Sequence, residues 1–186
     1  MDELTSLARA AGRGDRDALA EFVRQTQGDV WRFCAHLVDP AAADDLSQDT
    51  YLRAIPALRR FRGDAQVRTW LLTIARRVCA AEIGVRSRDR ELADRLAAAP
   101  TSGLGQPPPE PGAQTAVDLL LAVLEPDRRA AFVLTQLLGC SYAEAAAVCG
   151  CPIGTIRSRI ARARNDLDAM MRDPAEGPRS AGGHGH

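Results

Sequence analysis

A proline- and glycine-rich segment divides this sequence in two and constrains its fold more than any other feature. Residues 97–115 contain five prolines and three glycines, and almost no side chain that a core could bury. This composition is typical of an extended, flexible linker. We therefore predict two small domains, at 1–96 and 116–171, each of which buries its own core. Residues 172–186 are again rich in glycine, proline and small residues, which predicts a disordered tail.

Both domains show the apolar spacing of helices. Apolar residues recur at intervals of three and four, and no alternating β-branched runs are present. In the first domain this spacing predicts four helices, over about 4–11, 19–37, 42–58 and 67–78. Pro56 is expected to kink or shorten the third of them. We predict an all-α fold for the whole chain.

The second domain contains the pattern of a helix-turn-helix. Ser141 and Glu144 form a capping box, in which each side chain bonds to the backbone amide of the other. A short alanine-rich helix is predicted over 142–148, a turn at 150–152, and a further helix from Ile153. Small residues in the first of these two helices let the second cross it closely.

The last helix has two different faces. Ile153, Ile156, Ile160, Ala163 and Leu167 follow steps of three and four, so we predict that they pack inward. The other side carries arginines and small hydroxyls, which can contact guanine edges and phosphates. These features together predict a DNA-contacting helix, although an arginine-rich face alone also fits a merely solvated helix. The predicted DNA-binding residues are Thr155, Arg157, Ser158, Arg159, Arg162 and Arg164.

The charge is distributed in blocks of opposite sign. The formal net charge is zero, but residues 52–95 carry +6 and residues 128–165 carry +5, with acidic segments before, between and after them. This alternation fits a protein with two polyanion contacts and separate protein-facing surfaces, although solvated helix faces give the same sums.

Several classes of function are disfavoured by what the sequence contains. No apolar stretch is long enough to span a bilayer, and the acidic start has no signal-peptide pattern, so we expect a cytoplasmic protein without membrane contact. No paired carboxylates, phosphate loop or Cys/His/Asp constellation indicates an enzyme or a cofactor. Trp70 and His36 are expected at the core and at its edge. The five cysteines are expected to be free thiols. Three of them cluster at Cys140, Cys149 and Cys151, but no fourth Cys or His is near enough to predict a metal site.

Four segments of the chain resemble one protein family. Residues 139–164 (GCSYAEAAAVCGCPIGTIRSRIARAR) resemble region 4.2 of sigma-70 family sigma factors of the extracytoplasmic-function (ECF) group, and residues 124–135 resemble region 4.1. Residues 44–54 (DDLSQDTYLRA) resemble region 2.2, and residues 61–76 resemble regions 2.3 and 2.4. Among ECF sigma factors, the residues of these segments are most similar to those of the sigma-C-like group. The resemblance covers both domains in their order and implies regions 2 and 4 joined by the linker.

The resemblance also implies partners and sites. An ECF sigma factor binds core RNA polymerase, through its β′ clamp helices and β flap, and directs initiation at promoters with −35 and −10 elements. The last helix would then read the −35 element. The first basic block would engage the −10 element, where a base of the melted strand is held out of the stack. The residues for −10 binding are Arg68, Arg76, Arg77, Arg86 and Arg88. The residues for docking on the polymerase are Asp45, Leu46, Gln48, Asp49 and Leu52.

Two aspects of regulation and specificity are left open at this point. An Asp and an Arg common in the family correspond to Ala81 and Gly84 here, so no −10 sequence preference is carried over. Many members depend on a separate anti-sigma factor, and the sequence does not tell whether one exists for this chain.

Two other classes of function compete with this interpretation. An autonomous helix-turn-helix regulator would use its N-terminal domain to sense a ligand or to dimerise, and would bind an inverted repeat without polymerase. A helical adaptor with solvated basic faces would show no salt-dependent affinity for DNA.

Overall fold

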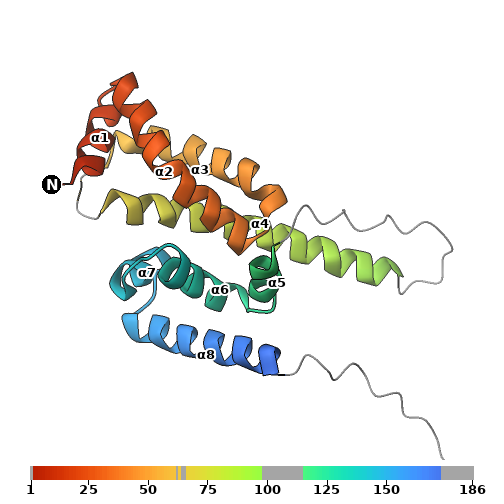
Figure 1. Ribbon diagram of the computed structural model, residues 1–186. Helices are drawn as coiled ribbons and strands as arrows, with labels where there is room; N and C mark the ends of the chain where they lie inside the picture. Colours follow the sequence, from red (N-terminus) through yellow and green to blue (C-terminus); the bar gives the residue numbers. More distant parts are fainter. Residues whose placement is uncertain (1, 62, 64–65, 98–114, 173–186) are drawn as a thin grey trace, which may run out of the picture.

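The structure is a computed structural model that describes residues 2–61, 63, 66–97 and 115–172. All regular elements in these ranges are helical, which confirms the predicted all-α class (Figure 1). They form two groups of helices, one before and one after the proline-rich segment. That predicted linker, apart from its ends at Ala97 and Thr115, and the predicted tail after Arg172 lie outside the described residues. No helix in the described ranges is long and apolar enough to cross a membrane.

The first helix group packs four helices around apolar side chains. Asp2, Asp15 and Asp39 cap helix starts by accepting hydrogen bonds from backbone amides. Phe22 and Phe33 are fully buried at the centre of the group. Its elements are α1 (Glu3–Gly12), α2 (Arg16–Leu37), the 3₁₀ turn η1 (Pro40–Ala42), α3 (Ala43–Leu58) and α4 (Val67–Ala97).

Helix α4 is longer than predicted, whereas α3 ends at the predicted residue. Helix α4 continues to Ala97 instead of ending near residue 78. Its second half contains good helix formers and two pairs at i,i+4 spacing, Arg86 with Glu82 and Arg95 with Glu91. Pro56 lies inside α3, which ends two residues later, as expected for a proline that shortens a helix.

The second helix group contains the predicted helix-turn-helix and two helices before it. The predicted capping box at Ser141 and Glu144 is formed at the start of α7, and a second one, of Thr115 and Asp118, is formed at the start of α5. Helix α6 continues into a π-helical turn that ends before Gly139, a residue with a left-handed φ of 68°. The elements are α5 (Ala116–Ala122), α6 (Pro126–Phe132), the π-helical turn η2 (Val133–Leu137), α7 (Tyr142–Cys149) and α8 (Ile153–Arg172).

The two helix groups lie against each other. In Figure 1, α6 and α7 lie between α4 and α8, and α5 lies beside the middle of α4. Buried apolar residues of both groups belong to one continuous cluster. The second half of α4 extends beyond both groups, and Leu92 and Leu96 on it are exposed.

Helix α1 packs closely on α3 at Gly12, so a larger side chain at this position is predicted to lower stability. A Cβ atom at this position would lie 2.6 Å from the carbonyl oxygen of Leu58, which is backbone and cannot swing away. We expect Gly12→Ala to lower the free energy of unfolding by about 1–3 kcal/mol, measured by urea denaturation. Gly28→Ala is the matched control, because nothing lies within 4 Å of its Cβ. It should raise stability by about 0.5–1 kcal/mol. Equal effects of the two changes would contradict this prediction.

Candidate nucleic-acid interface

The turn between α7 and α8 is built by local interactions. Ser141 N donates to Glu144 Oε2 at 2.7 Å, and Glu144 N donates to Ser141 Oγ at 3.2 Å. Gly150 ends α7 with a left-handed φ of 64°, a conformation that glycine adopts without strain. Helix α8 begins three residues later, after Pro152. The predicted helix-turn-helix is therefore present, with α8 in the position of the recognition helix.

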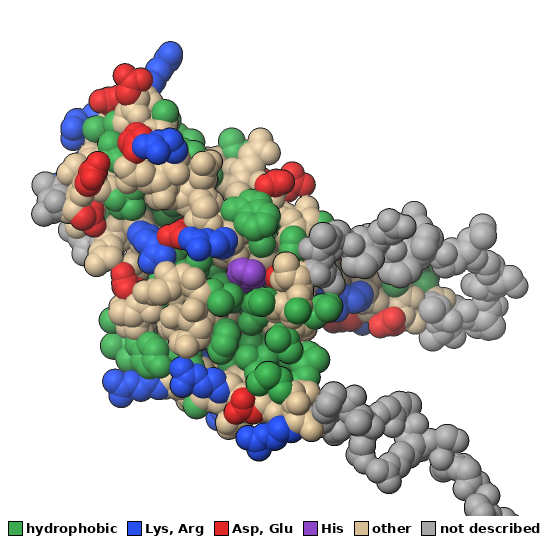
Figure 2. Space-filling model, viewed as in Figure 1, with side chains coloured by type: hydrophobic (Ala, Val, Ile, Leu, Met, Phe, Trp, Pro, Cys, Tyr) green, Lys and Arg blue, Asp and Glu red, His purple; other side chains and the backbone are tan. Residues whose placement is uncertain are grey.

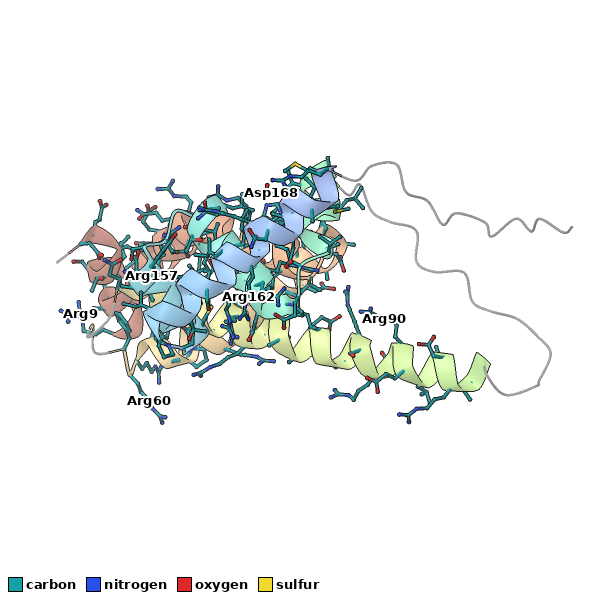
Figure 3. All side chains as sticks on the ribbon, turned by 90° about the horizontal axis from the view of Figure 1, so that it is seen from below. Arg9, Arg60, Arg90, Arg157, Arg162 and Asp168 are labelled. Atoms are coloured by element: carbon teal, nitrogen blue, oxygen red, sulfur yellow. The ribbon has the colours of Figure 1, made fainter. Side chains whose placement is uncertain are left out.

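The inner face of α8 is apolar and its outer face is basic. Ile156, Ile160 and Ala163 are buried against α6 and α7, as predicted. Ile153 is 42% exposed, so the prediction that it packs inward is wrong; it is the first residue of the helix. Arginine side chains follow the outer edge of α8 in Figure 2, and Figure 3 shows Arg157 and Arg162 on this helix.

The six predicted residues of α8 are not equally available. Arg157, Ser158, Arg162 and Arg164 are exposed, whereas Thr155 and Arg159 are half-buried. Arg159 donates one hydrogen bond to Asp127 Oδ2 and another to Cys151 Sγ at 3.6 Å. The exposed face is therefore a strip of arginines with one hydroxyl, while Arg159 is held at its edge.

Asp127 on α6 connects the two predicted nucleic-acid surfaces. Its Oδ2 accepts a hydrogen bond from Arg159 of α8, and its Oδ1 accepts one from Arg76 of α4 at 2.9 Å. One carboxylate therefore holds an arginine predicted for the −35 element and one predicted for the −10 element.

Arg68 makes the second polar connection between the groups. Its Nε donates to Asp29 Oδ2 at 2.6 Å, and its Nη2 donates to the carbonyl oxygen of Leu138 at 2.6 Å. Burial alone would lower the pKa of Arg68, but the hydrogen bond and charge of Asp29 raise it above the ordinary value. Arg68 is therefore charged and tied into the contact between the groups.

The remaining arginines of the predicted −10 set lie farther along α4. Arg77 and Arg88 are exposed. Arg86 pairs with Asp39 and with Glu82, and these bonds outweigh the effect of burial and raise the pKa of Arg86. Within the predicted set, exposed cations are thus Arg77 and Arg88, whereas the other three arginines hold carboxylates.

His36 and Trp70, which were expected near the core, each have a specific contact. His36 Nδ1 lies 2.8 Å from Asp118 Oδ1, so the histidine has a partner, which belongs to the other helix group. Burial would raise the pKa of Asp118, but hydrogen bonds from Thr115 and then from His36 hold it below the ordinary value. Trp70 is half-buried and contacts Phe61, with ring centroids 5.2 Å apart.

The predicted docking residues of α3 divide between surface and core. We call the exposed set Asp45, Gln48, Asp49 and Leu52 the acidic face; Leu52 is 63% exposed. Leu46 is only 7% exposed and lies in the core, so its assignment to a docking surface is wrong. Its position on α3 points it toward the other helices of the group, opposite the acidic face.

Two surface features were not predicted from the sequence. Helix α5 exposes Val117 and Leu119, and Val123 directly after it is also exposed; together they form an apolar patch visible in Figure 2. Six of the seven residues in the α5 sequence, AVDLLLA, are apolar, which was the available signal that some of them must remain uncovered. Between α2 and α3 lies a pocket of about 510 Å³, beside which Trp31 Nε1 donates to Asp44 Oδ1 at 2.8 Å. No group of three metal-ligating side chains is placed to hold a metal ion in the described ranges.

Comparisons with known proteins agree with this arrangement. The family description "Sigma-70 region 2" matches residues 22–90, and "Sigma-70, region 4" matches residues 114–167. The ECF RNA polymerase sigma factor SigC of Mycobacterium tuberculosis is 49% identical over 175 residues, which cover 92% of this chain and 91% of that protein. The ECF RNA polymerase sigma-E factor of Escherichia coli is 29% identical over 173 residues, which cover 87% of this chain and 91% of that protein.

Solved structures of two complexes show the same architecture. The structure of CnrH in complex with the cytosolic domain of CnrY has a TM-score of 0.72 at 27% identity, covering 94% of this chain and 100% of that chain. The sigma factor RpoE of Bartonella quintana, in complex with the anti-sigma factor NepR, has a TM-score of 0.65 at 31% identity, covering 84% and 98%.

The fold and the arginine-rich recognition helix define a two-domain helical protein of the transcription-initiation class. The matched regions occur in the order of that class, region 2 in the first helix group and region 4 in the second. The chain belongs to the ECF group of the sigma-70 family of RNA polymerase sigma factors.

Proposed function

We propose that this sigma factor reads the −35 element with the outer face of α8 and the −10 element with the arginines of α4. The observation that carries the proposal is the exposed strip of Arg157, Ser158 and Arg162 on a helix that follows a helix-turn-helix turn. Arginine contacts guanine edges through two hydrogen bonds, and serine contacts either bases or phosphates. The protein directs core RNA polymerase to promoters, and the polymerase does the chemistry; this chain catalyses nothing and acts in the cytoplasm, where that DNA lies.

The acidic face of α3 is the surface that we assign to the β′ clamp helices of core RNA polymerase. Two carboxylates, an amide and an exposed leucine on one helical face suit a basic helical partner with an apolar side chain. The exposed apolar patch on α5 is our candidate for the contact with the β flap, because contiguous apolar surface marks protein interfaces.

An anti-sigma factor is a further partner in this proposal. The two structural relatives above are complexes with CnrY and with NepR, and the second is named as an anti-sigma factor. In this chain the two helix groups are closed onto each other by Asp127 and Arg68, so a partner that holds both groups has one continuous body to bind.

Run-off transcription tests the proposed function. Bacterial core RNA polymerase is incubated with a library of genomic fragments, with and without this protein. We expect specific transcripts only with the protein, and their alignment gives the two promoter elements. Direct binding of the free protein to an inverted repeat, with no added transcripts, would instead support an autonomous regulator.

Charge reversal on the acidic face tests the docking surface. We expect Asp45→Arg with Asp49→Arg to weaken core polymerase binding by about tenfold or more, because like charges across an interface cost several kcal/mol. The dissociation constant is measured by fluorescence anisotropy of labelled protein. Asp94→Arg is the matched control, since Asp94 is also an exposed aspartate on a helix but lies near the end of α4. Equal affinities of the double variant and the unmodified protein would remove this assignment.

A further inference from the structure

Two cysteines face each other in the core of the first helix group. Cys34 of α2 and Cys79 of α4 are both 0% exposed, and the Cys79 thiol donates to Cys34 Sγ across 3.6 Å. A disulfide requires a sulfur separation of about 2.05 Å, so the atoms need to approach by about 1.5 Å. A small displacement of α2 and α4 toward each other would therefore let Cys34 and Cys79 form a disulfide bond.

The surroundings make the two sulfurs chemically different. The hydrogen bond from Cys79 lowers the pKa of Cys34, and hydroxyls of Ser47 and Thr50 lower it further, against the effect of burial. The same hydrogen bond and burial raise the pKa of Cys79. The thiolate is the nucleophilic form of cysteine, so Cys34 is the attacking sulfur and Cys79 the second, resolving thiol.

The pocket between α2 and α3 is lined by Ser47, a neighbour of Cys34, although neither cysteine lines it. Ser47, Gln48 and Tyr51 of α3 line the 510 Å³ pocket, together with Trp31 of α2. Ser47 Oγ is buried and makes no hydrogen bond within the described residues, so its hydroxyl is free to turn toward the nearby Cys34 sulfur. A small polar molecule in the pocket contacts Ser47, so a small opening of the packing around Ser47 is needed for it to reach the buried sulfur.

We propose that Cys34 and Cys79 form a disulfide bond when a peroxide oxidises the protein, and that this bond disables the first helix group. The Cys34 thiolate attacks one peroxide oxygen, the O–O bond breaks, hydroxide leaves, and Cys34 becomes a sulfenic acid. The sulfur of Cys79 then attacks the sulfur of Cys34, the S–O bond breaks, and the hydroxyl leaves as water with the thiol proton. Two thiols are oxidised, and one hydrogen peroxide is reduced to two waters.

The position of the pair connects it to both proposed surfaces of the domain. Arg76 and Arg77 lie within one turn of Cys79 on α4. Trp31 lies within one turn of Cys34 on α2 and donates to Asp44, the neighbour in α3 of the acidic-face residue Asp45. Drawing the two helices together in a close-packed core shifts the side chains around them, because such cores do not absorb displacement freely. Formation of the bond is therefore expected to move the arginines of α4 relative to the acidic face.

Mass spectrometry with peptide mapping tests the chemistry independently of the proposed function. The folded full-length protein is treated with hydrogen peroxide, alkylated, digested and mapped. We expect a peptide pair joined through Cys34 and Cys79, a loss of two hydrogen atoms, and reversal by dithiothreitol. Cys34→Val and Cys79→Val should abolish the joined peptides, whereas Cys149→Val, a buried cysteine outside the pair, should retain them. Oxidation at Cys151 alone, or joined peptides that form only in denaturant, would overturn the proposal.

Run-off transcription tests the consequence, and this readout rests on the proposed function. Peroxide should reduce transcript yield from the unmodified protein at least fivefold, with recovery in dithiothreitol, while Cys34→Val remains active. Loss of activity in Cys34→Val after the same treatment would show that another site is responsible. Joined peptides in a protein that supports no transcription at all would leave the disulfide in place and refute the sigma function.

Discussion

Replacing Arg162 with alanine is expected to weaken recognition of the −35 element by about 10- to 100-fold. Arg162 is exposed at the middle of the outer face of α8, where no described acidic residue pairs with it. An arginine that makes two hydrogen bonds to a guanine contributes about 1–3 kcal/mol of discrimination. Run-off transcription by the reconstituted holoenzyme, on promoters with single base changes in the −35 element, measures the effect.

The pattern across promoters distinguishes base contacts from phosphate contacts. If Arg162 reaches a base, Arg162→Ala loses discrimination at one position only. If it reaches only phosphate, binding weakens equally at all promoters, and the slope of log affinity against log salt concentration becomes shallower by about one. Arg172→Ala is the matched control, because Arg172 is an exposed arginine at the far end of the same helix. Unchanged transcription from Arg162→Ala would remove α8 from its proposed role.

Neutralising Asp127 is expected to strengthen binding of the free protein to duplex DNA by about tenfold. Asp127→Asn keeps the shape of the side chain but removes the charge that holds Arg76 and Arg159. Partly exposed ion pairs contribute about 0.2–1 kcal/mol each, so the loss of two of them accounts for a change of this size. Titration of a labelled promoter fragment at fixed salt measures the affinity, and small-angle X-ray scattering measures any separation of the helix groups.

A control in the same helix group separates this effect from a simple change in charge. Asp166 of α8 pairs with Arg128 of its own helix group at 2.8 Å and does not contact Arg159. Asp166→Asn removes the same charge from the same domain and should change DNA affinity much less. Weaker binding by Asp127→Asn would show that the carboxylate orients Arg159 for DNA instead of withholding it.

Local patterns in the sequence predicted the elements of the recognition site. The capping box at Ser141 and Glu144 and the glycine at Gly150 are short-range signals, and each formed as expected. The exposed face of α8 followed from the spacing of Ile156 and Ile160. These features depend only on neighbours within a turn or two, so a single sequence contains them.

Contacts between distant residues were not predictable in the same way. Asp127 meets Arg76 across 51 positions, and Arg68 meets Leu138 across 70 positions. No spacing rule joins such residues, because their meeting depends on how the two helix groups dock. Leu46 was misassigned for a different reason. The resemblance to region 2.2 suggested it for docking, whereas the apolar spacing of the third helix already placed it on the same side as Leu58, and both are buried.

The two helix groups belong to one polypeptide. Their contact therefore needs less binding free energy to stay closed than a contact between two separate proteins. A covalent connection gives two domains an effective local concentration on the order of millimolar. If the same interface joined two separate proteins with a dissociation constant of about that concentration, then within one chain it would be closed about half the time. In this chain the shared apolar cluster adds to the polar bonds of Asp127 and Arg68, so the closed form is favoured, and a partner that separates the groups must supply more binding energy than this contact holds.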